Sequence, residues 1–207
     1  MSRASNELRG RIVELTTRRF LLRDFNDTDS DAFEAYHSDP RSHEFYGTEH
    51  TTTEYARKLL ELFRAWAAEQ PRVNFQLAII RRGDPQILVG CCGLRSGGEE
   101  KGTAELGIEL APEYWGRYAY ATEVMHALVE FGFGTLNLHT IYGGTVSANS
   151  RIARLVNALG ATAIIRPSPE WMRSKGWSNV EWRITRDQWA NFRLTSAGTR
   201  GEGHERE

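Results

Sequence analysis

The spacing of apolar residues along the chain predicts an alternation of strands and helices. Seven segments alternate apolar and polar positions or are rich in β-branched and aromatic residues, as strands are: 18–25, 75–80, 87–94, 104–110, 139–146, 162–166 and 180–184. Five segments have apolar residues three and four positions apart, as helices do: those that begin near Asp27, Thr51, Ala121, Asn149 and Thr185. Strands and helices are thus interspersed along the chain.

Two pairs of polar residues mark where helices begin. Thr51 with Glu54, and Thr185 with Gln188, match the capping box, in which each side chain bonds to the backbone of the other residue. We therefore expect one helix to begin at Thr51, and a short last helix to begin at Thr185 and continue through Phe192.

The stretch from Glu105 to Gly160 alternates strand, turn and helix twice, and it is the part of the chain most suited to binding a ligand. Strand 104–110 passes into a helix through a short turn that carries Arg117. The first-turn N–H groups of a helix have no partner within the helix, and the helix dipole directs its positive end at the same point. Such a turn predicts an anion site. Arg117 and Thr122 are candidate ligands, and Arg154 could reach the same side.

Length and charge limit the class of protein. The chain has 207 residues, enough for one domain with a substantial core. Its 26 lysines and arginines against 27 aspartates and glutamates leave a net charge of -1, so no overall field attracts nucleic acid. We expect a flexible N-terminal tail over 1–9, one domain over 10–195 and a disordered C-terminal tail over 196–207, because the ends have little to bury.

The sequence shows no membrane segment and no metal motif. It has no run of about 18 apolar residues, and its start (MSRASNELRG) lacks the apolar region of a signal peptide. We therefore expect a cytoplasmic protein that binds neither a membrane nor nucleic acid. The adjacent Cys91 and Cys92 point to opposite faces of a predicted strand, which favours core packing over a disulfide or zinc site. The six histidines lack metal-ligand spacing, so we expect no metal.

Four stretches match sequence motifs of one known family, in the same order and with the same spacing. They are 116–123 (GRYAYATE) preceded by PEYW, 149–160 (NSRIARLVNALG), 19–23 (RFLLR) and 89–94 (VGCCGL). Together they resemble the GNAT acyltransferases, and specifically the branch of ribosomal-protein N-terminal (alanine or serine) acetyltransferase-like enzymes. The resemblance covers roughly Thr17 to Trp189.

The resemblance implies an α/β (α+β) GNAT fold, with a mixed, mostly antiparallel sheet of about seven strands and helices on both faces. It also implies acetyl-CoA as co-substrate, with its pyrophosphate on the amides that start the central helix. The central strand would splay away from strand 139–146, leaving backbone N–H groups near Leu110 for the pantetheine arm and the thioester carbonyl. The predicted cofactor-binding residues are Leu110, Gly116, Arg117, Tyr118, Ala119, Tyr120, Ala121, Thr122, Asn149 and Arg154.

Four residues depart from the family's pattern. Gly116 stands where Gln or Arg is usual, and Ala119 where Gly is usual. Ile152 replaces a Ser, and Val156 replaces the Tyr with which many relatives protonate the leaving thiolate. The departures at Ala119, Ile152 and Val156 support a rival hypothesis, a non-catalytic module of GNAT fold that binds acyl-CoA or a protein partner. A third alternative is a domain that no longer binds CoA.

Acyl transfer from a thioester to an amine requires a neutral amine, donors for the oxyanion and a proton for the leaving thiolate. Glu105 and Glu109 lie four residues apart on the central strand, hence on one face. We assign the base to Glu105, because family members commonly carry a functional Glu early in this strand; an ion-paired surface glutamate and deprotonation through waters are the alternatives. For the acid we assign Tyr142, with Tyr118 and Ser147 as alternatives, and a thiolate can also leave without a dedicated acid.

The acceptor is expected to contact Glu44 and Tyr46 of an early loop, Glu109 of the central strand and Trp171 of a late loop. In the resembling family the two early helices form one wall of the acceptor cleft. The branch favours the N-terminal amine of a peptide or protein, and a small amine is the alternative, with direct attack in a ternary complex. Dimers are common in the family, so a homodimer is an open alternative.

Overall fold

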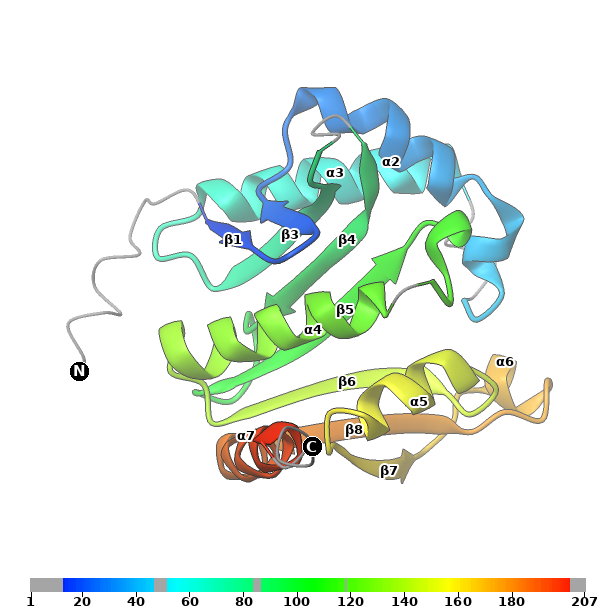
Figure 1. Ribbon diagram of the computed structural model, residues 1–207. Helices are drawn as coiled ribbons and strands as arrows, with labels where there is room; N and C mark the ends of the chain where they lie inside the picture. Colours follow the sequence, from blue (N-terminus) through cyan, green and yellow to red (C-terminus); the bar gives the residue numbers. More distant parts are fainter. Residues whose placement is uncertain (1–12, 47–51, 84–86, 118, 202–207) are drawn as a thin grey trace, which may run out of the picture.

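The computed structural model describes residues 13–46, 52–83, 87–117 and 119–201 (Figure 1). The strands are β1 (Glu14–Thr16), β2 (Phe20–Arg23), β3 (Asn74–Arg81), β4 (Leu88–Arg95), β5 (Thr103–Leu110), β6 (Thr140–Val146), β7 (Thr162–Arg166) and β8 (Asn179–Thr185). The α-helices are α2 (Ser30–His37), α3 (Thr53–Ala68), α4 (Tyr120–Glu130), α5 (Ser150–Asn157), α6 (Glu170–Arg173) and α7 (Arg186–Gly201). Short turns of other helix types are η1 (Asp27–Asp29), η2 (Pro40–His43), η4 (Pro112–Tyr114) and η5 (Phe131–Thr135).

One mixed sheet runs through the described part of the chain. Its eight strands lie in the order β1-β2-β3-β4-β5-β6-β8-β7, and each neighbouring pair is antiparallel except β5 with β6. The predicted fold class is confirmed, with one strand more than expected. The extra strand is β1, which precedes the predicted first strand, 18–25. Only the short β2 forms within that segment, and it pairs with β1 through a tight connection.

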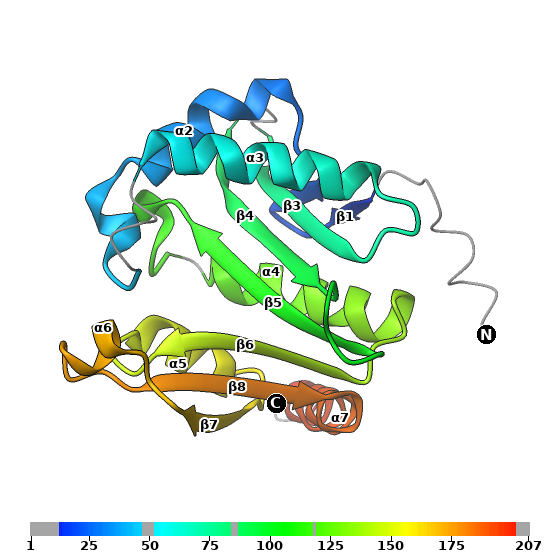
Figure 2. The same cartoon turned by 180° about the vertical axis from the view of Figure 1, so that it is seen from behind.

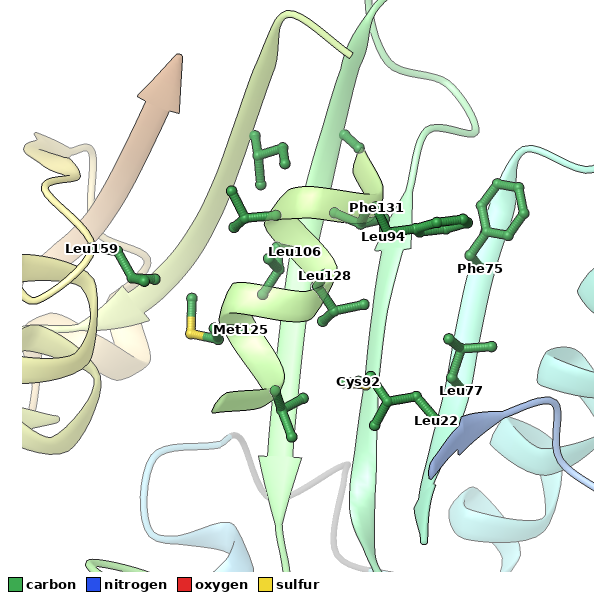
Figure 3. Close-up of a cluster of buried hydrophobic side chains, with 14 of the residues drawn as sticks. Leu22, Phe75, Leu77, Cys92, Leu94, Leu106, Met125, Leu128, Phe131 and Leu159 are labelled. Atoms are coloured by element: carbon green, nitrogen blue, oxygen red, sulfur yellow. The ribbon is translucent and has the colours of Figure 1, made fainter. Parts of the chain in front are cut away.

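Helices cover both faces of the sheet. Helices α2 and α3 lie on one face, and α4 and α5 lie on the other, as the two opposite views show (Figures 1 and 2). Strands β3 and β4 are buried on both faces, so their residues feed two hydrophobic clusters in alternation. Figure 3 shows the cluster under α4, to which Met125, Leu106 and Cys92 belong. Cys91 belongs to the other cluster, under α2 and α3, which confirms that the two cysteines point to opposite faces.

Strands β5 and β6 pair only at their beginnings. The register runs Thr103 with Thr140, Ala104 with Ile141 and Glu105 with Tyr142, and it stops there. Beyond Glu105 the two strands diverge (Figure 2). The expected splay is therefore observed, and it occurs without a register shift between β4 and β5.

The predicted helix starts are confirmed in one case and shifted in the other. The Thr185 and Gln188 capping box forms, since each side-chain oxygen accepts from the backbone N–H of the other residue. For α3 the start was misplaced by one residue: the N-cap is Thr52, whose hydroxyl oxygen accepts from the N–H of Tyr55, and Thr51 lies outside the described residues. A capping box needs Gln or Glu three residues after the N-cap, and three residues after Thr52 the chain has Tyr55.

The last helix is longer than the sequence suggested. Helix α7 continues past Phe192 to Gly201 and so enters the segment predicted as the C-terminal tail. The division of the chain into a domain and two tails stays a prediction.

The start of α4 is tied to the β1–β2 corner through Glu123. Its carboxylate accepts hydrogen bonds from the hydroxyl of Thr17 and from the backbone N–H and Nε of Arg19, each at 2.7 Å. Burial raises the pKa of Glu123, but these donors outweigh it and hold the pKa below its usual value. The contacts join the first turn of α4 to a segment about a hundred residues earlier in the chain.

We expect Glu123→Ala to lower the free energy of unfolding at pH 7 by about 1 to 3 kcal/mol, because three charge-assisted hydrogen bonds are lost. A carboxyl whose folded pKa is depressed stabilises the fold above its unfolded pKa, and this contribution disappears as the pH falls through the folded pKa. The difference from wild type should therefore shrink between pH 5 and pH 3 in urea titrations. Glu61→Ala, at an exposed position of α3, is the control. Equal stability of Glu123→Ala and wild type at pH 7 would contradict the assignment.

Candidate functional site

A cavity of about 730 Å³ occupies the opening between β5 and β6. It is lined by β5 from Glu105 onward and by residues of β4, β6 and β8. The turn before α4, the beginning of α4, α5, α6, and η2 with the residues after it complete the lining. The volume lies in the range of small-molecule sites. Among the described lining residues there are five arginines and two glutamates, so the cavity carries excess positive charge and suits an anionic ligand.

The turn that enters α4 has an unusual backbone. Ala119 is the N-cap residue of α4 and has φ of 54° and ψ of 37°, in the left-handed region. Gly116 also has a positive φ, 67°. Both residues line the cavity, as do Arg117, Ala121 and Thr122. The turn therefore brings the positive end of the α4 dipole and its first-turn backbone to the cavity wall.

The open edge of β5 presents backbone groups to the cavity. The N–H of Ala111 donates to the carbonyl of Val89, so it faces β4. Because neighbouring residues of a strand direct their N–H groups to opposite edges, the N–H and carbonyl of Leu110 face the opening instead. The carbonyl accepts a hydrogen bond from the indole Nε1 of Trp115, at 2.6 Å. The N–H of Leu110 is thereby directed at the space that a ligand would fill.

Helix α5 forms the opposite wall. Asn149 is its N-cap, and the side-chain oxygen accepts from the N–H of Ile152 at 3.3 Å. This bond uses only the oxygen of the Asn149 side chain, so its amide nitrogen can donate to a ligand. Arg154 is exposed and donates from Nε to the carbonyl of Ser150. Asn149, Ile152 and Arg154 all line the cavity.

The two glutamates of β5 have different environments. The carboxylate of Glu105 is 39% exposed and is paired with Arg95, whose Nη2 lies 3.0 Å from Oε2. The carboxylate of Glu109 is 20% exposed, and its nearest basic neighbour is Nε2 of His37 at 3.6 Å. Burial raises the pKa of Glu109 to about 7, and burial with the nearby His43 lowers the pKa of His37 to about 4. The imidazole of His37 is therefore uncharged at neutral pH, and the 3.6 Å contact is not an ion pair.

Two predicted site residues do not line the cavity, and a third lies outside the described residues. The hydroxyl of Tyr142 donates to Glu99 at 2.9 Å on the exposed side of β6, and burial with this bond raises its pKa to about 12. The structure thus separates Tyr142 from the cavity. Tyr142 is the last residue of β6 that pairs with β5, and the β6 residues that line the cavity, 144–146, come after the strands diverge. Glu44 is likewise not a lining residue, and Tyr118 is the residue that is not described. The other predicted residues, including Tyr46 and Trp171, do line it.

Arg151 is a cavity residue that sequence reasoning missed. Its guanidinium pairs with Glu44 at 2.8 Å, lies over the ring of Trp115 at 4.2 Å and over that of Phe45 at 5.3 Å. These contacts join α5 to the segment after η2 and to the turn before α4, across the mouth of the cavity. No local pattern could reveal them, because Glu44 lies 107 positions earlier in the chain.

Two kinds of feature are absent from the described residues. They contain no group of three or more His, Cys, Asp or Glu side chains that could hold a metal ion. None of the described helices is long and apolar enough to cross a bilayer.

We expect Ala119→Gly to raise the free energy of unfolding by about 0.5 to 1 kcal/mol, because glycine adopts the left-handed region without the clash of a Cβ. Ala127→Gly, inside α4, is the matched control and should lower stability by about 1 kcal/mol. Thermal and urea unfolding of both variants measure the pair. A loss of stability in Ala119→Gly as large as that in the control would show that the left-handed turn is not strained.

Because burial disfavours the charged form of Glu109, this group reduces stability as the pH rises from its unfolded pKa toward about 7. Glu109→Gln removes the charge and should raise the free energy of unfolding at pH 8 by on the order of 1 to 3 kcal/mol, with little change at pH 4. Urea titrations at both pH values measure this difference. A gain that is the same at pH 4 and pH 8 would mean that the charge of Glu109 is not the cause.

Known proteins are similar to this chain in sequence and in fold. The sequence model described as "Acetyltransferase (GNAT) domain" matches residues 19–162. The "Uncharacterized N-acetyltransferase YoaA" of Bacillus subtilis is 31% identical over 147 residues, which are 70% of this chain and 81% of that protein. A GNAT-family acetyltransferase of Bacillus anthracis superposes with a TM-score of 0.68 at 21% identity, covering 84% of this chain and 99% of the other. Mycobacterium smegmatis RimJ, in complex with CoA-disulfide, gives a TM-score of 0.66 at 17% identity, covering 90% and 94%.

The two structural similarities show the fold, and they are too distant to assign this chain to the ribosomal-protein acetyltransferase branch. The family model covers more than half of the chain, and the YoaA relative exceeds 30% identity over more than two thirds of it. The chain therefore belongs to the GNAT acetyltransferase family.

Proposed function

We propose that the protein transfers the acetyl group of acetyl-CoA to a primary amine by direct attack in a ternary complex. The observation that carries the proposal is the divergence of β5 and β6 beside the start of α4, which puts an open strand edge, a helix N-terminus and a carboxylate of raised pKa in one cavity. The acceptor is the N-terminal amine of a peptide or protein, or a small amine.

The residues around the cavity fit acetyl-CoA. The turn from Gly116 to Thr122 offers backbone amides and Arg117 to the pyrophosphate, and Arg154 adds charge from the facing helix. Leu110 and Asn149 both line the cavity, and the N–H of Leu110 and the amide nitrogen of Asn149 suit the pantetheine arm. The RimJ structure was determined with CoA-disulfide, which supports a CoA site in this fold. When bound, acetyl-CoA supplies an activated acyl group on a thiolate leaving group.

Glu109 is the better base, in place of Glu105. A base that works near neutral pH needs a pKa near 7, which burial gives to Glu109. Glu105 instead forms an ion pair with Arg95, and its side chain is 39% exposed, against 20% for Glu109. The acceptor, bound as an ammonium ion, first loses a proton to Glu109. The neutral nitrogen then bonds to the carbonyl carbon, the carbon–sulfur bond breaks, CoA leaves as its thiolate, and the second proton of the nitrogen passes through water to that thiolate. The N–H of Leu110 is placed to stabilise the oxyanion.

The leaving thiolate needs no side-chain acid in this proposal. Val156 is buried and cannot donate a proton, and Tyr142 lies outside the cavity lining. A thiolate of ordinary thiol pKa is a tolerable leaving group, and water can protonate it. The departures at Ile152 and Val156 therefore do not count against turnover.

Isothermal titration of acetyl-CoA, followed by a thiol-release assay with a panel of amines, tests the proposal. We expect micromolar binding that Arg117→Ala weakens about tenfold, whereas Arg18→Ala, an exposed arginine outside the cavity lining, leaves it unchanged. Glu109→Gln should lower kcat on the order of a hundredfold without changing the Kd of acetyl-CoA. The wild-type kcat/KM should rise with pH through about 7, because the ionised carboxylate is the active form.

Two results would contradict the proposal. No binding of acetyl-CoA at millimolar concentration would remove the CoA site itself. Tight binding without CoA release for any amine would favour the rival function, a non-catalytic acyl-CoA-binding module, which the residues at Ala119 and Val156 first suggested.

A further inference from the structure

A second cavity of about 280 Å³ lies between β5 and the helices α2 and α3. We call it the side pocket, and it shares five lining residues with the main cavity: Tyr46, Arg95, Gly107, Ile108 and Glu109. The two cavities therefore meet at β5 beside Glu109. An amine whose nitrogen lies at Glu109 can therefore extend its remaining atoms into the side pocket.

The wall of the side pocket that belongs to α3 is apolar and rich in rings. Tyr55, Leu59, Phe63 and Trp66 line it from successive turns of the helix. Rings packed in this way favour a flat apolar group, which gains from burial and from stacking. A benzene ring fits a cavity of about 150 Å³, so a pocket of about 280 Å³ has room for one ring, a short chain and an amine.

Two histidines of the side pocket have ring nitrogens without a hydrogen-bond partner among the described residues. They are Nδ1 and Nε2 of His37, whose side chain is only 8% exposed, and Nε2 of His43. A buried polar atom without a partner costs free energy, so such atoms indicate a ligand that completes the site. Nε2 of His37 lies 3.6 Å from Oε2 of Glu109, which lets one nitrogen atom of a ligand bond to both.

The charges of the side pocket limit the acceptor further. Among its described lining residues Glu109 is the sole carboxylate, so a second ammonium group would have no anionic partner. The sole guanidinium is that of Arg95, and it already bonds to Glu105 and to Oε1 of Gln76. A carboxylate on the acceptor would therefore find no unengaged cation. The pocket suits an acceptor with a single charge, on its amine.

From these contacts we propose that the acceptor is a small primary amine with one flat apolar ring, which seats the ring against α3 and its nitrogen between Glu109 and His37. The proposal rests on the acetyl transfer described above, in which the ammonium of this acceptor loses one proton to Glu109, the nitrogen gains the acetyl group, and the second proton passes through water to the thiolate of the released CoA. A polyamine and a peptide beginning with alanine fit the pocket less well, the first by its charge and the second by its small side chain.

The test uses the full chain and phenethylamine as the probe. Titrated into CoA-saturated protein, phenethylamine should bind, and Leu59→Trp, which fills the pocket, should weaken binding at least tenfold. Leu62→Trp is the matched control, since Leu62 is 41% exposed on the same helix and is not a lining residue. In the thiol-release assay, kcat/KM for phenethylamine should exceed that for spermidine and for an N-terminal alanine peptide at least tenfold.

Two further variants keep the proposal falsifiable if Leu59→Trp does not fold. Leu59→Ala enlarges the pocket and should shift the preference toward tryptamine, whose ring system is larger. His37→Phe keeps a ring but removes both nitrogens, and it should raise the KM for phenethylamine while the Kd of acetyl-CoA stays the same.

The outcomes separate this inference from the proposed function. Turnover of spermidine or the alanine peptide in preference to phenethylamine overturns the inference and leaves acetyl transfer standing. The same holds if acetyl transfer occurs but Leu59→Trp and Leu59→Ala leave the kinetics with phenethylamine unchanged. Phenethylamine binding that depends on Leu59, without CoA release for any amine, supports the pocket assignment and overturns acetyl transfer.

Discussion

The site exists because β5 and β6 do not pair with each other beyond Glu105. Up to that residue the strands pair in parallel, and beyond it their edges face a cavity instead of each other. Unpaired strand edges are costly unless something satisfies them. Here the indole of Trp115 satisfies the carbonyl of Leu110, while the N–H of the same residue stays directed at the opening. The separation of two strands thus creates both the cavity and its most specific donor.

Two carboxylates of the same strand differ in how deeply they are buried. Glu105 and Glu109 lie on the same face, but the first reaches Arg95 and solvent, whereas the second lies between the main cavity and the side pocket. A carboxylate without a charged partner in such a place has a raised pKa, as Glu109 does. Because Glu109 borders both cavities, the proposed reaction and the proposed choice of acceptor depend on the same residue.

The sequence predicted the parts of this arrangement that depend on local pattern. Strand and helix periodicity located the other elements but missed β1 and α6. The turn before α4 was expected to face a ligand because of its position between a strand and a helix. The different environments of Glu105 and Glu109 could not be predicted from the sequence. They depend on α2, α3 and Arg95, which come close to these residues only in the folded chain. Tyr142 shows the same limit. The sequence indicated a hydroxyl nearby, but it could not show that Tyr142 lies where β6 still pairs with β5, before the cavity opens. Histidine nitrogens left without partners have no signature in sequence at all.

The central claim is that the N–H of Leu110 faces a CoA site, and amide hydrogen exchange followed by NMR tests it most directly. Leu110 should exchange rapidly in the free protein, whereas Ala111, whose N–H bonds to Val89, should be protected. Saturation with acetyl-CoA should slow exchange at Leu110 at least tenfold and change Ala111 little. Slow exchange of Leu110 in the free protein, or exchange that acetyl-CoA does not alter, would contradict the claim.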